Sequence, residues 1–140
     1  MTRETLQSWL RAYGLAWEQR NAQAAADLFA EDAVYSVLPF TAPVRGGHEL
    51  LKYWKRVTSS QEQIHFDFEI LAAGPAEGVA HWWASFVRPS ERKRLELDGI
   101  CVVVLNPEGR CTRFREWWHR RETMLPSGRN ATARPVRPLP

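Results

Sequence analysis

The stretch Leu95–Glu122, LELDGICVVVLNPEGRCTRFREWWHRRE, decides the fold of this chain. Two apolar or aromatic runs flank Asn106–Gly109, in which the proline fixes φ at the second turn position and the glycine can adopt the positive φ that closes the turn. Leu97–Leu105 is rich in β-branched residues and lacks a helical period, which predicts a buried strand. Residues 112–120 alternate in polarity, which predicts a partner strand and therefore a β-hairpin.

One carboxylate interrupts the apolar side of the second strand. Phe114, Glu116 and Trp118 point to one side of it. A buried charge costs several kcal/mol unless it is paired or reached by water. An apolar pocket would raise the pKa of this carboxyl toward neutrality, as proton transfer near pH 7 requires. The alternative is a structural carboxylate paired with an Arg or Tyr of the pocket wall. The opposite side of the strand carries a basic and aromatic set: Arg113, Arg115, Trp117 and His119.

The pairing register of the hairpin determines what lies opposite Glu116. Without a bulge, Gly99 lies opposite Glu116 and Asp98 points outward. A bulge at Gly109 would slip the pairing by one residue and turn Asp98 inward beside Trp118. We favour the register without a bulge.

Length and composition predict one globular, cytoplasmic domain. No apolar run approaches the roughly 20 residues of a membrane helix, and the polar N-terminus is no signal peptide. Seven tryptophans are many for 140 residues, and clustered tryptophans often line ligand pockets. The formal charge of +3 equals the contribution of Arg129, Arg134 and Arg137, so the rest of the chain is neutral, which argues against a nucleic-acid surface. Cys101 and Cys111 do not face each other across the hairpin, which predicts free thiols.

The predicted order of elements is helix, helix, strand, helix and then four consecutive strands. Consecutive strands with short turns form an antiparallel meander, and the helices must cover one of its faces. We therefore expect an α+β domain over residues 1–125 and a disordered Pro/Arg-rich tail over 126–140. The predicted helices are Thr2–Arg20, Ala22–Ala30 and His48–Val57, and the strands are Val34–Leu38, Ile64–Ala72, Val79–Val87, Leu97–Leu105 and Thr112–Arg120.

Two residues are good candidates for helix N-caps. Thr2 precedes the first helical pattern and Asn21 precedes the second. The residue three positions after Thr2 is Thr5 rather than Glu or Gln, so we expect no full capping box there.

The chain resembles the nuclear-transport-factor-2-like superfamily, in its SnoaL-like branch. The resemblance covers about residues 5–122 and implies a cone-shaped, cystatin-like fold in which three N-terminal helices pack on a curved antiparallel sheet. That superfamily includes ketosteroid isomerases, limonene epoxide hydrolases, polyketide cyclases, dehydratases and non-catalytic binding proteins. Besides the order of elements, the resemblance rests on WEQRNAQAAADLFAEDAVY (17–35), VRGGHELLKYW (44–54) and GRCTRFREWW (109–118).

The resemblance also suggests roles for single residues. Tyr13 matches the oxyanion-hole tyrosine of ketosteroid isomerases, but Val37 stands in place of their general base and Cys101 in place of their protonated Asp. Two of three key residues are therefore missing, which argues against steroid isomerisation. The run 115–118, Arg-Glu-Trp-Trp, is similar to a catalytic Arg-Asp-aromatic-aromatic run of limonene epoxide hydrolases. Their companion Arg-x-Asp is absent from residues 81–85, HWWAS.

Polyketide cyclases of this fold use a carboxylate as a proton shuttle, which Glu116 could supply alone. We therefore expect a cofactor-independent isomerase, cyclase or hydrolase in which Glu116 and Tyr13 act on a small apolar, cyclic or polyketide-like molecule. The alternative is a non-catalytic ligand-binding or regulatory domain, and the two hypotheses differ in whether Glu116 and Tyr13 converge in one cavity. The residues expected to contact the ligand are Trp17, Val37, Trp83, Cys101, Phe114 and Trp118.

A metal site is the less favoured interpretation of the histidines and carboxylates. His65, Asp67 and Glu69 share one side of a strand whose other side is apolar, so we expect them to face solvent. The alternation around His81 leaves its facing open.

The helix-free side of the sheet is a candidate interface. Trp117 is a large aromatic residue on that side, and exposed tryptophans of this kind often mark an interface. We therefore expect a homodimer, and members of the superfamily that the chain resembles commonly pair through this face.

Overall fold

The structure, a computed structural model, describes residues 1–126, so the predicted tail over 126–140 lies outside the described residues except for Pro126. The described part is an α+β domain of three α-helices, one 3₁₀ helix and a six-stranded sheet. Its helices are α1 (Arg3–Glu18), α2 (Ala22–Ala26), α3 (Gly47–Ser59) and the 3₁₀ helix η1 (Pro89–Glu91). Its strands are β1 (Phe29–Ser36), β2 (Val44–Arg45), β3 (Glu62–Ala73), β4 (Gly78–Arg88), β5 (Lys93–Leu105) and β6 (Cys111–Met124).

The sheet is mixed rather than antiparallel, which corrects the prediction. Its strand order is β2-β1-β6-β5-β4-β3, and β1 pairs with β6 in parallel while the other neighbours are antiparallel. Most of the chain, including α3, separates β1 from β6, and a long connection of this kind permits parallel pairing. The parallel pair places β1 directly beside the closing strand.

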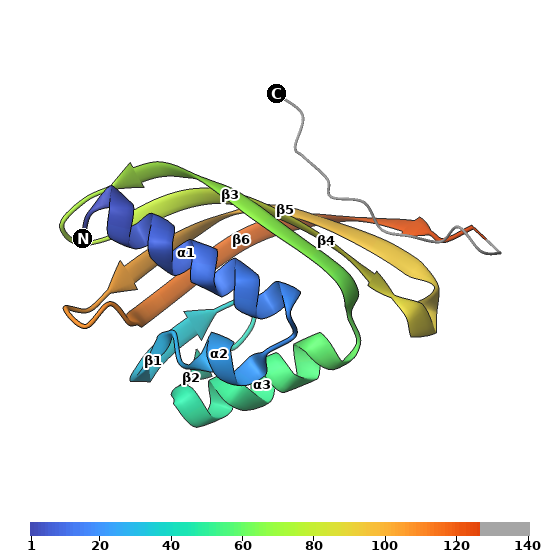
Figure 1. Cartoon of the computed structure of the whole chain (residues 1–140), viewed down its shortest axis with the longest axis horizontal. Helices are drawn as coiled ribbons and strands as arrows, with labels where there is room; N and C mark the ends of the chain where they lie inside the picture. The colour runs from blue at the N-terminus through green and yellow to red at the C-terminus, as the bar shows by residue number, and fades with distance from the viewer. Residues whose placement is uncertain (127–140) are drawn as a thin grey trace.

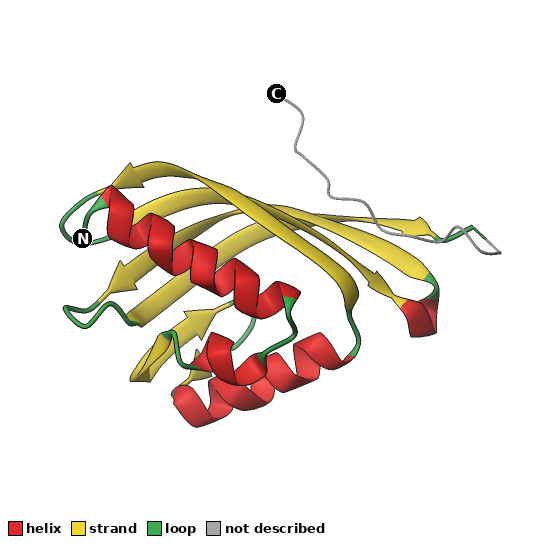
Figure 2. Ribbon diagram, in the orientation of Figure 1, coloured by secondary structure: helices red, strands yellow, loops and turns green. Residues whose placement is uncertain are grey.

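The helices lie on the concave side of the curved sheet (Figure 1). α1 runs across this side beneath β3, and α2 and α3 close its lower part. The far ends of β4, β5 and β6 extend beyond α1, α2 and α3, and η1 connects β4 to β5 there (Figure 2). The convex side carries no helix of the described part. None of the helices within residues 1–126 is long and apolar enough to span a bilayer.

Among the helix boundaries, the end of α2 differs most from the prediction. α2 ends at Ala26 rather than Ala30, because Phe29 and Ala30 already belong to β1, where Phe29 pairs with Cys111. The predicted N-cap Asn21 accepts a hydrogen bond from the backbone N–H of Ala24 at 3.0 Å.

At the start of α1 a capping box is present, although none was expected. The Thr2 hydroxyl accepts from the Thr5 N–H at 3.1 Å, and the Thr5 hydroxyl accepts from the Thr2 N–H at 3.0 Å. A threonine hydroxyl therefore serves where Glu or Gln is usual.

The central hairpin contains a bulge, so the predicted register is wrong. The turn is as expected, with Gly109 at φ 82°, but Thr112 is an extra residue between the pairs Leu105–Cys111 and Val104–Arg113. As a result, Gly99 lies opposite Trp118, and Glu116 lies opposite Cys101. The pairing differs from the predicted one by two residues, and a shift by an even number keeps every side chain on its predicted side.

Both cysteines are buried and free, as predicted. Cys101 and Cys111 lie on β5 and β6, and each is opposite another residue: Glu116 for the first and Leu105 for the second.

α1 approaches β3 closely at Gly14. A Cβ atom built at this buried position would overlap the ring of Phe66 on β3. The neighbouring Tyr13 packs against the same ring, with centroids 5.5 Å apart. The absence of a side chain at position 14 therefore sets the depth at which Tyr13 enters the core.

We predict that Gly14→Ala destabilises the protein by about 1–3 kcal/mol, because the added methyl group must displace the Phe66 ring. This loss opposes the gain of about 1 kcal/mol that alanine brings to a helix interior. Urea unfolding measures the difference, with Ser8→Ala on the exposed side of α1 as the control for helix propensity. A Gly14→Ala variant that gained as much stability as the control would contradict the prediction.

Candidate functional site

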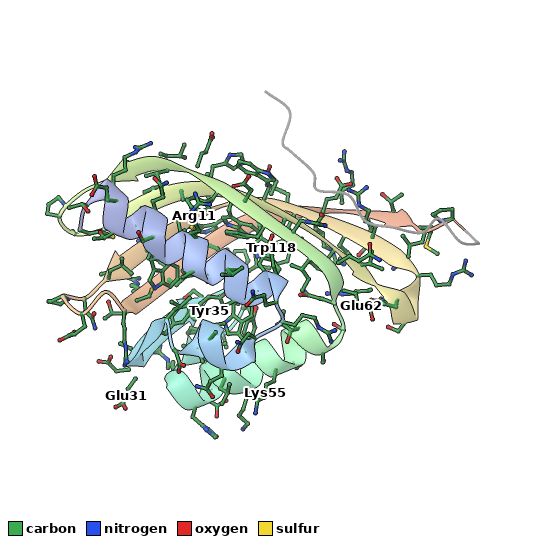
Figure 3. The ribbon with its side chains drawn as sticks, in the orientation of Figure 1. Arg11, Glu31, Tyr35, Lys55, Glu62 and Trp118 are labelled. Atoms are coloured by element: carbon green, nitrogen blue, oxygen red, sulfur yellow. The ribbon has the colours of Figure 1, made fainter. Side chains whose placement is uncertain are left out.

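A central cavity of about 130 Å³ lies between α1, α3 and the concave side of the sheet. Its wall is mostly aromatic and aliphatic, and Glu116 is the one carboxylate among its lining residues in the described chain. The lining residues are Tyr13, Trp17, Tyr35, Val37, Tyr53, Trp54, Val57, Gln61, Trp82, Phe86, Arg88, Leu95, Leu97, Glu116, Trp118 and Arg120. In Figure 3, Tyr35 and Trp118 lie between helices and sheet, whereas Glu31 and Lys55 point outward.

Glu116 ends a chain of hydrogen bonds that begins on α1. The hydroxyl of Tyr35 donates to Oε1 of Glu116 at 3.5 Å. The hydroxyls of Tyr35 and Tyr13 are 3.0 Å apart. Because the Tyr35 proton is engaged by Glu116, the Tyr13 hydroxyl is the donor to Tyr35. Glu116 and Tyr13 thus converge in one cavity, and Tyr35 connects them.

Burial changes the protonation of this carboxyl group. The side chain of Glu116 is 6% exposed, and desolvation raises its pKa from the ordinary 4.5 to about 8. Interactions with the Tyr35 hydroxyl and the Trp118 side chain offset part of this rise in the pKa. Glu116 is therefore mostly a neutral acid at pH 7, which is the form that can donate a proton.

The tyrosines around Glu116 remain protonated for the same reason. Burial first, and the nearby Glu116 second, raise the pKa of Tyr13, Tyr35 and Tyr53 well above 10. The cavity therefore presents neutral hydrogen-bond donors, a suitable environment for a ligand that carries acceptor oxygens.

Five of the eight predicted site residues line the cavity. Trp17, Val37 and Trp118 line it, together with Glu116 and Tyr13. Phe114 lies behind its wall, where its ring stacks on Tyr35 at 4.9 Å and on Tyr13 at 5.5 Å.

Besides Phe114, two further predicted contact residues do not line the cavity. Cys101 is buried opposite Glu116 on the neighbouring strand. Trp83 points to the convex side, where its ring packs beside His81 at 5.0 Å. Trp82 occupies the position predicted for Trp83, and the pattern HWWASF alone does not distinguish the two.

The sequence interpretation missed Tyr35, although a signal for it was present. Val37 was singled out as a cavity residue, and in an extended segment Tyr35 shares its side. Tyr53 and Trp54 on α3 were missed for another reason. Trp54 is buried on the apolar side of α3, but only the packing of α3 against β1 brings Trp54 and Tyr53 to the cavity.

The convex side holds a second set of titratable groups. His81 bridges two carboxylates, with Nδ1 3.2 Å from Glu69 and Nε2 3.0 Å from Asp98. His81 and Asp98 therefore both face outward, which settles the facing that the sequence left open. Within residues 1–126, no group of three or more His, Cys, Asp or Glu side chains has an arrangement that could hold a metal ion.

Comparison with known proteins supports the fold and one family. A family model described as the SnoaL-like domain matches residues 10–114. Among curated proteins, none matches the sequence.

Solved structures with the same fold are distant in sequence. The epoxide hydrolase/cyclase-like enzyme SalBIII, from pyran ring formation in the polyether salinomycin, has a TM-score of 0.73 and 16% identity over 85% of this chain and 95% of its own. An LEH-like epoxide hydrolase of M. tuberculosis has a TM-score of 0.64 and 18% identity over 84% of each chain. A computationally designed 17-OHP binder has a TM-score of 0.74 and 13% identity over 84% and 96%.

We predict that Glu116 makes the stability of the protein depend on pH. Its pKa is higher in the folded protein than in the unfolded chain, so the folded state binds this proton more tightly. The resulting stabilisation is complete below pH 4.5 and is lost as the pH rises through about 8. This loss amounts to several kcal/mol.

Glu116→Gln isolates this contribution, because the amide does not titrate. Denaturant unfolding of both proteins between pH 5 and pH 9 should show a stability difference that moves in favour of the variant as the pH rises. Parallel curves for the two proteins would contradict the assignment.

Proposed function

Because the chain belongs to the SnoaL-like domain family, we propose that it is a cofactor-independent acid–base enzyme acting on a small apolar ring compound. The observation that carries this proposal is the buried Glu116, whose neutral form is favoured at pH 7 in a cavity built of aromatic residues. Such a carboxyl group can donate a proton to a ligand oxygen and take one back.

The hydrogen bonds of Glu116 assign separate tasks to its two oxygens. Tyr35 donates to Oε1, so the other oxygen carries the proton and donates it to a carbonyl or ether oxygen of the ligand. Tyr13 donates to Tyr35, holds it in place, and also lines the cavity beside the ligand. With a ketone, the proton leaves Glu116 as the carbonyl oxygen becomes an enol hydroxyl, and the resulting carboxylate accepts the proton of the neighbouring carbon as the C=C bond forms. With a cyclic ether, the proton leaves Glu116 as the C–O bond breaks and its oxygen becomes a hydroxyl. A second hydroxyl of the ligand then forms the new C–O bond at the released carbon and gives its proton to the carboxylate.

This cycle consumes no proton and needs one carboxylate. The single carboxylate at the cavity therefore favours isomerisation or cyclisation over hydrolysis, because hydrolysis also needs a group that activates water. SalBIII, a structural neighbour, is described as acting in pyran ring formation, which is chemistry of this class. The competing hypothesis is a binding domain that uses the same cavity without turnover.

We predict that Glu116→Gln lowers kcat by about 100-fold while the ligand still binds. The substrate can be identified by mass spectrometry of a molecule co-purified in the cavity. Assays on ring-opened or isomeric forms of that molecule then test turnover. In the unmodified enzyme, kcat should fall as the pH rises through about 8, because the acid form of Glu116 disappears. Glu108→Gln in the exposed hairpin turn is the control for the loss of a carboxylate. A fully active Glu116→Gln variant would exclude the catalytic role and leave the binding domain.

We also propose that the protein forms a homodimer through the convex side of the sheet. Trp117 is 42% exposed on this side and lies beneath the Arg115 guanidinium, 5.8 Å from the ring centroid. The strand opposite contributes Ile100 and Val102, which are only partly buried. An exposed aromatic and aliphatic patch of this kind suits an interface between two copies.

We predict a species of twice 16.2 kDa in sedimentation velocity experiments. Trp117→Glu should shift it to the monomer, because a charge would then be buried twice in a symmetric interface. Leu15→Glu, an exposed apolar position on α1, is the matched control. A monomeric unmodified protein at micromolar concentration would contradict the proposal.

A further inference from the structure

The central cavity contains hydrogen-bond donors that the proposed proton transfer does not use. The indole Nε1 atoms of Trp54 and Trp82 are buried and have no hydrogen-bond partner among residues 1–126. The two residues are 2% and 3% exposed, and both line the cavity. A buried donor without a partner destabilises a folded protein, so groups of this kind indicate that something else occupies the site.

Other buried indoles of the same protein are satisfied. Nε1 of Trp9 donates to the carbonyl of Leu28 at 2.9 Å, and Nε1 of Trp17 donates to the side chain of Gln61 at 2.7 Å. The ring of Trp17 contacts the rings of both unsatisfied indoles, with its centroid 6.0 Å from that of Trp54 and 6.3 Å from that of Trp82. Of the three cavity-lining tryptophans in this contact, Trp17 is satisfied by Gln61, whereas Trp54 and Trp82 lack a partner among residues 1–126.

The mouth of the cavity is basic. Arg88 and Arg120, which we call the mouth arginines, line the cavity at the ends of β4 and β6 and are partly exposed. Each has one acidic neighbour, Glu91 at 3.5 Å and Glu122 at 2.9 Å, and Lys93 shares Glu122 at 3.2 Å. This group of five side chains has one excess positive charge. Nε of Arg88 is also buried without a partner in the described chain.

The size of the cavity limits the ligand. A cavity of about 150 Å³ accommodates one benzene molecule, and the central cavity measures about 130 Å³. The enclosed part of the ligand is therefore one ring, and any further group must extend toward the mouth arginines.

We propose that the cavity binds a single-ring organic carboxylate, with an acceptor oxygen on the ring facing the indole N–H of Trp54 or Trp82 and the carboxylate at Arg88 and Arg120. Guanidinium groups suit this end because they bind carboxylates through paired hydrogen bonds. The assignment of this molecule as a substrate rests on the proposed function, since it places the ring beside Glu116.

Three probes separate the features of the ligand: 3-(4-oxocyclohexyl)propanoate, its propanamide, and 3-cyclohexylpropanoate. Quenching of tryptophan fluorescence, checked by calorimetry, gives their dissociation constants. The keto acid should bind about tenfold more tightly than its amide, because the mouth arginines prefer a charge. It should bind about fivefold more tightly than the acid without the ketone, because a neutral hydrogen bond is weaker.

Two double variants test the assignment of these ratios. Arg88→Gln with Arg120→Gln should abolish the preference for acid over amide and keep the preference for the ketone. Trp54→Phe with Trp82→Phe should do the opposite, and the use of ratios cancels the loss of packing that smaller rings cause. Arg45→Gln and Trp83→Phe, which lie outside the cavity, are the matched controls and should change neither ratio.

The proposal is overturned if the unmodified protein binds acid and amide equally, if it binds none of the probes, or if either ratio survives its own double variant. Equal affinity for the acids with and without the ketone would mean that water satisfies the indole N–H groups. This result would also overturn the proposal. Glu116→Gln distinguishes this result from the proposed function. Both affinity ratios should persist in that variant. Selective binding of the keto acid without turnover would refute only the proposed catalysis. Glu116-dependent turnover of neutral ring ketones, without preference for the acid, would refute only the proposed carboxylate ligand.

Discussion

The parallel pairing of β1 with β6 is the constraint on which the cavity depends. It sets Tyr35 opposite Phe114, and the two rings stack at 4.9 Å. From this position the Tyr35 hydroxyl reaches both Glu116 on β6 and Tyr13 on α1. One strand pair therefore connects the helical layer with the sheet through polar atoms, inside a core that is otherwise aromatic. If β1 were not held beside β6, Glu116 would lose its hydrogen-bond donor and the cavity its innermost wall.

Local patterns in the sequence predicted the elements and the sides of the strands. The alternation of Phe114, Glu116 and Trp118 was sufficient to place a carboxylate in the core, and the structure has it 6% exposed. The register of the hairpin was not predictable, because the bulge at Thr112 depends on the turn and on the pairing of Cys111 with Phe29 of a distant strand. The side that each side chain faces was nevertheless predicted correctly, because the pairing moved by two residues.

The contacts between distant segments were less predictable than the elements. No local pattern shows that β1 joins the sheet beside β6, so neither the parallel pair nor the role of Tyr35 followed from the sequence. The adjacent Trp82 and Trp83 illustrate a second limit. Two neighbouring aromatics fit either side of a strand equally well, and only the pairing with Gly99 and Asp98 on β5 decides which one enters the cavity.

Separation of charges explains how one small cavity can hold both an acid and two arginines. A guanidinium beside Glu116 would lower its pKa and keep it ionised, yet the groups that shift this pKa are burial, Tyr35 and Trp118. Arg115, its neighbour in sequence, points to the convex side and pairs with Glu77 at 3.2 Å. The mouth arginines stand at the exposed ends of the strands, beyond the tryptophans of the wall. The aromatic layer therefore has two effects: it desolvates the carboxyl group, and it keeps cations far enough away that the proton stays on Glu116.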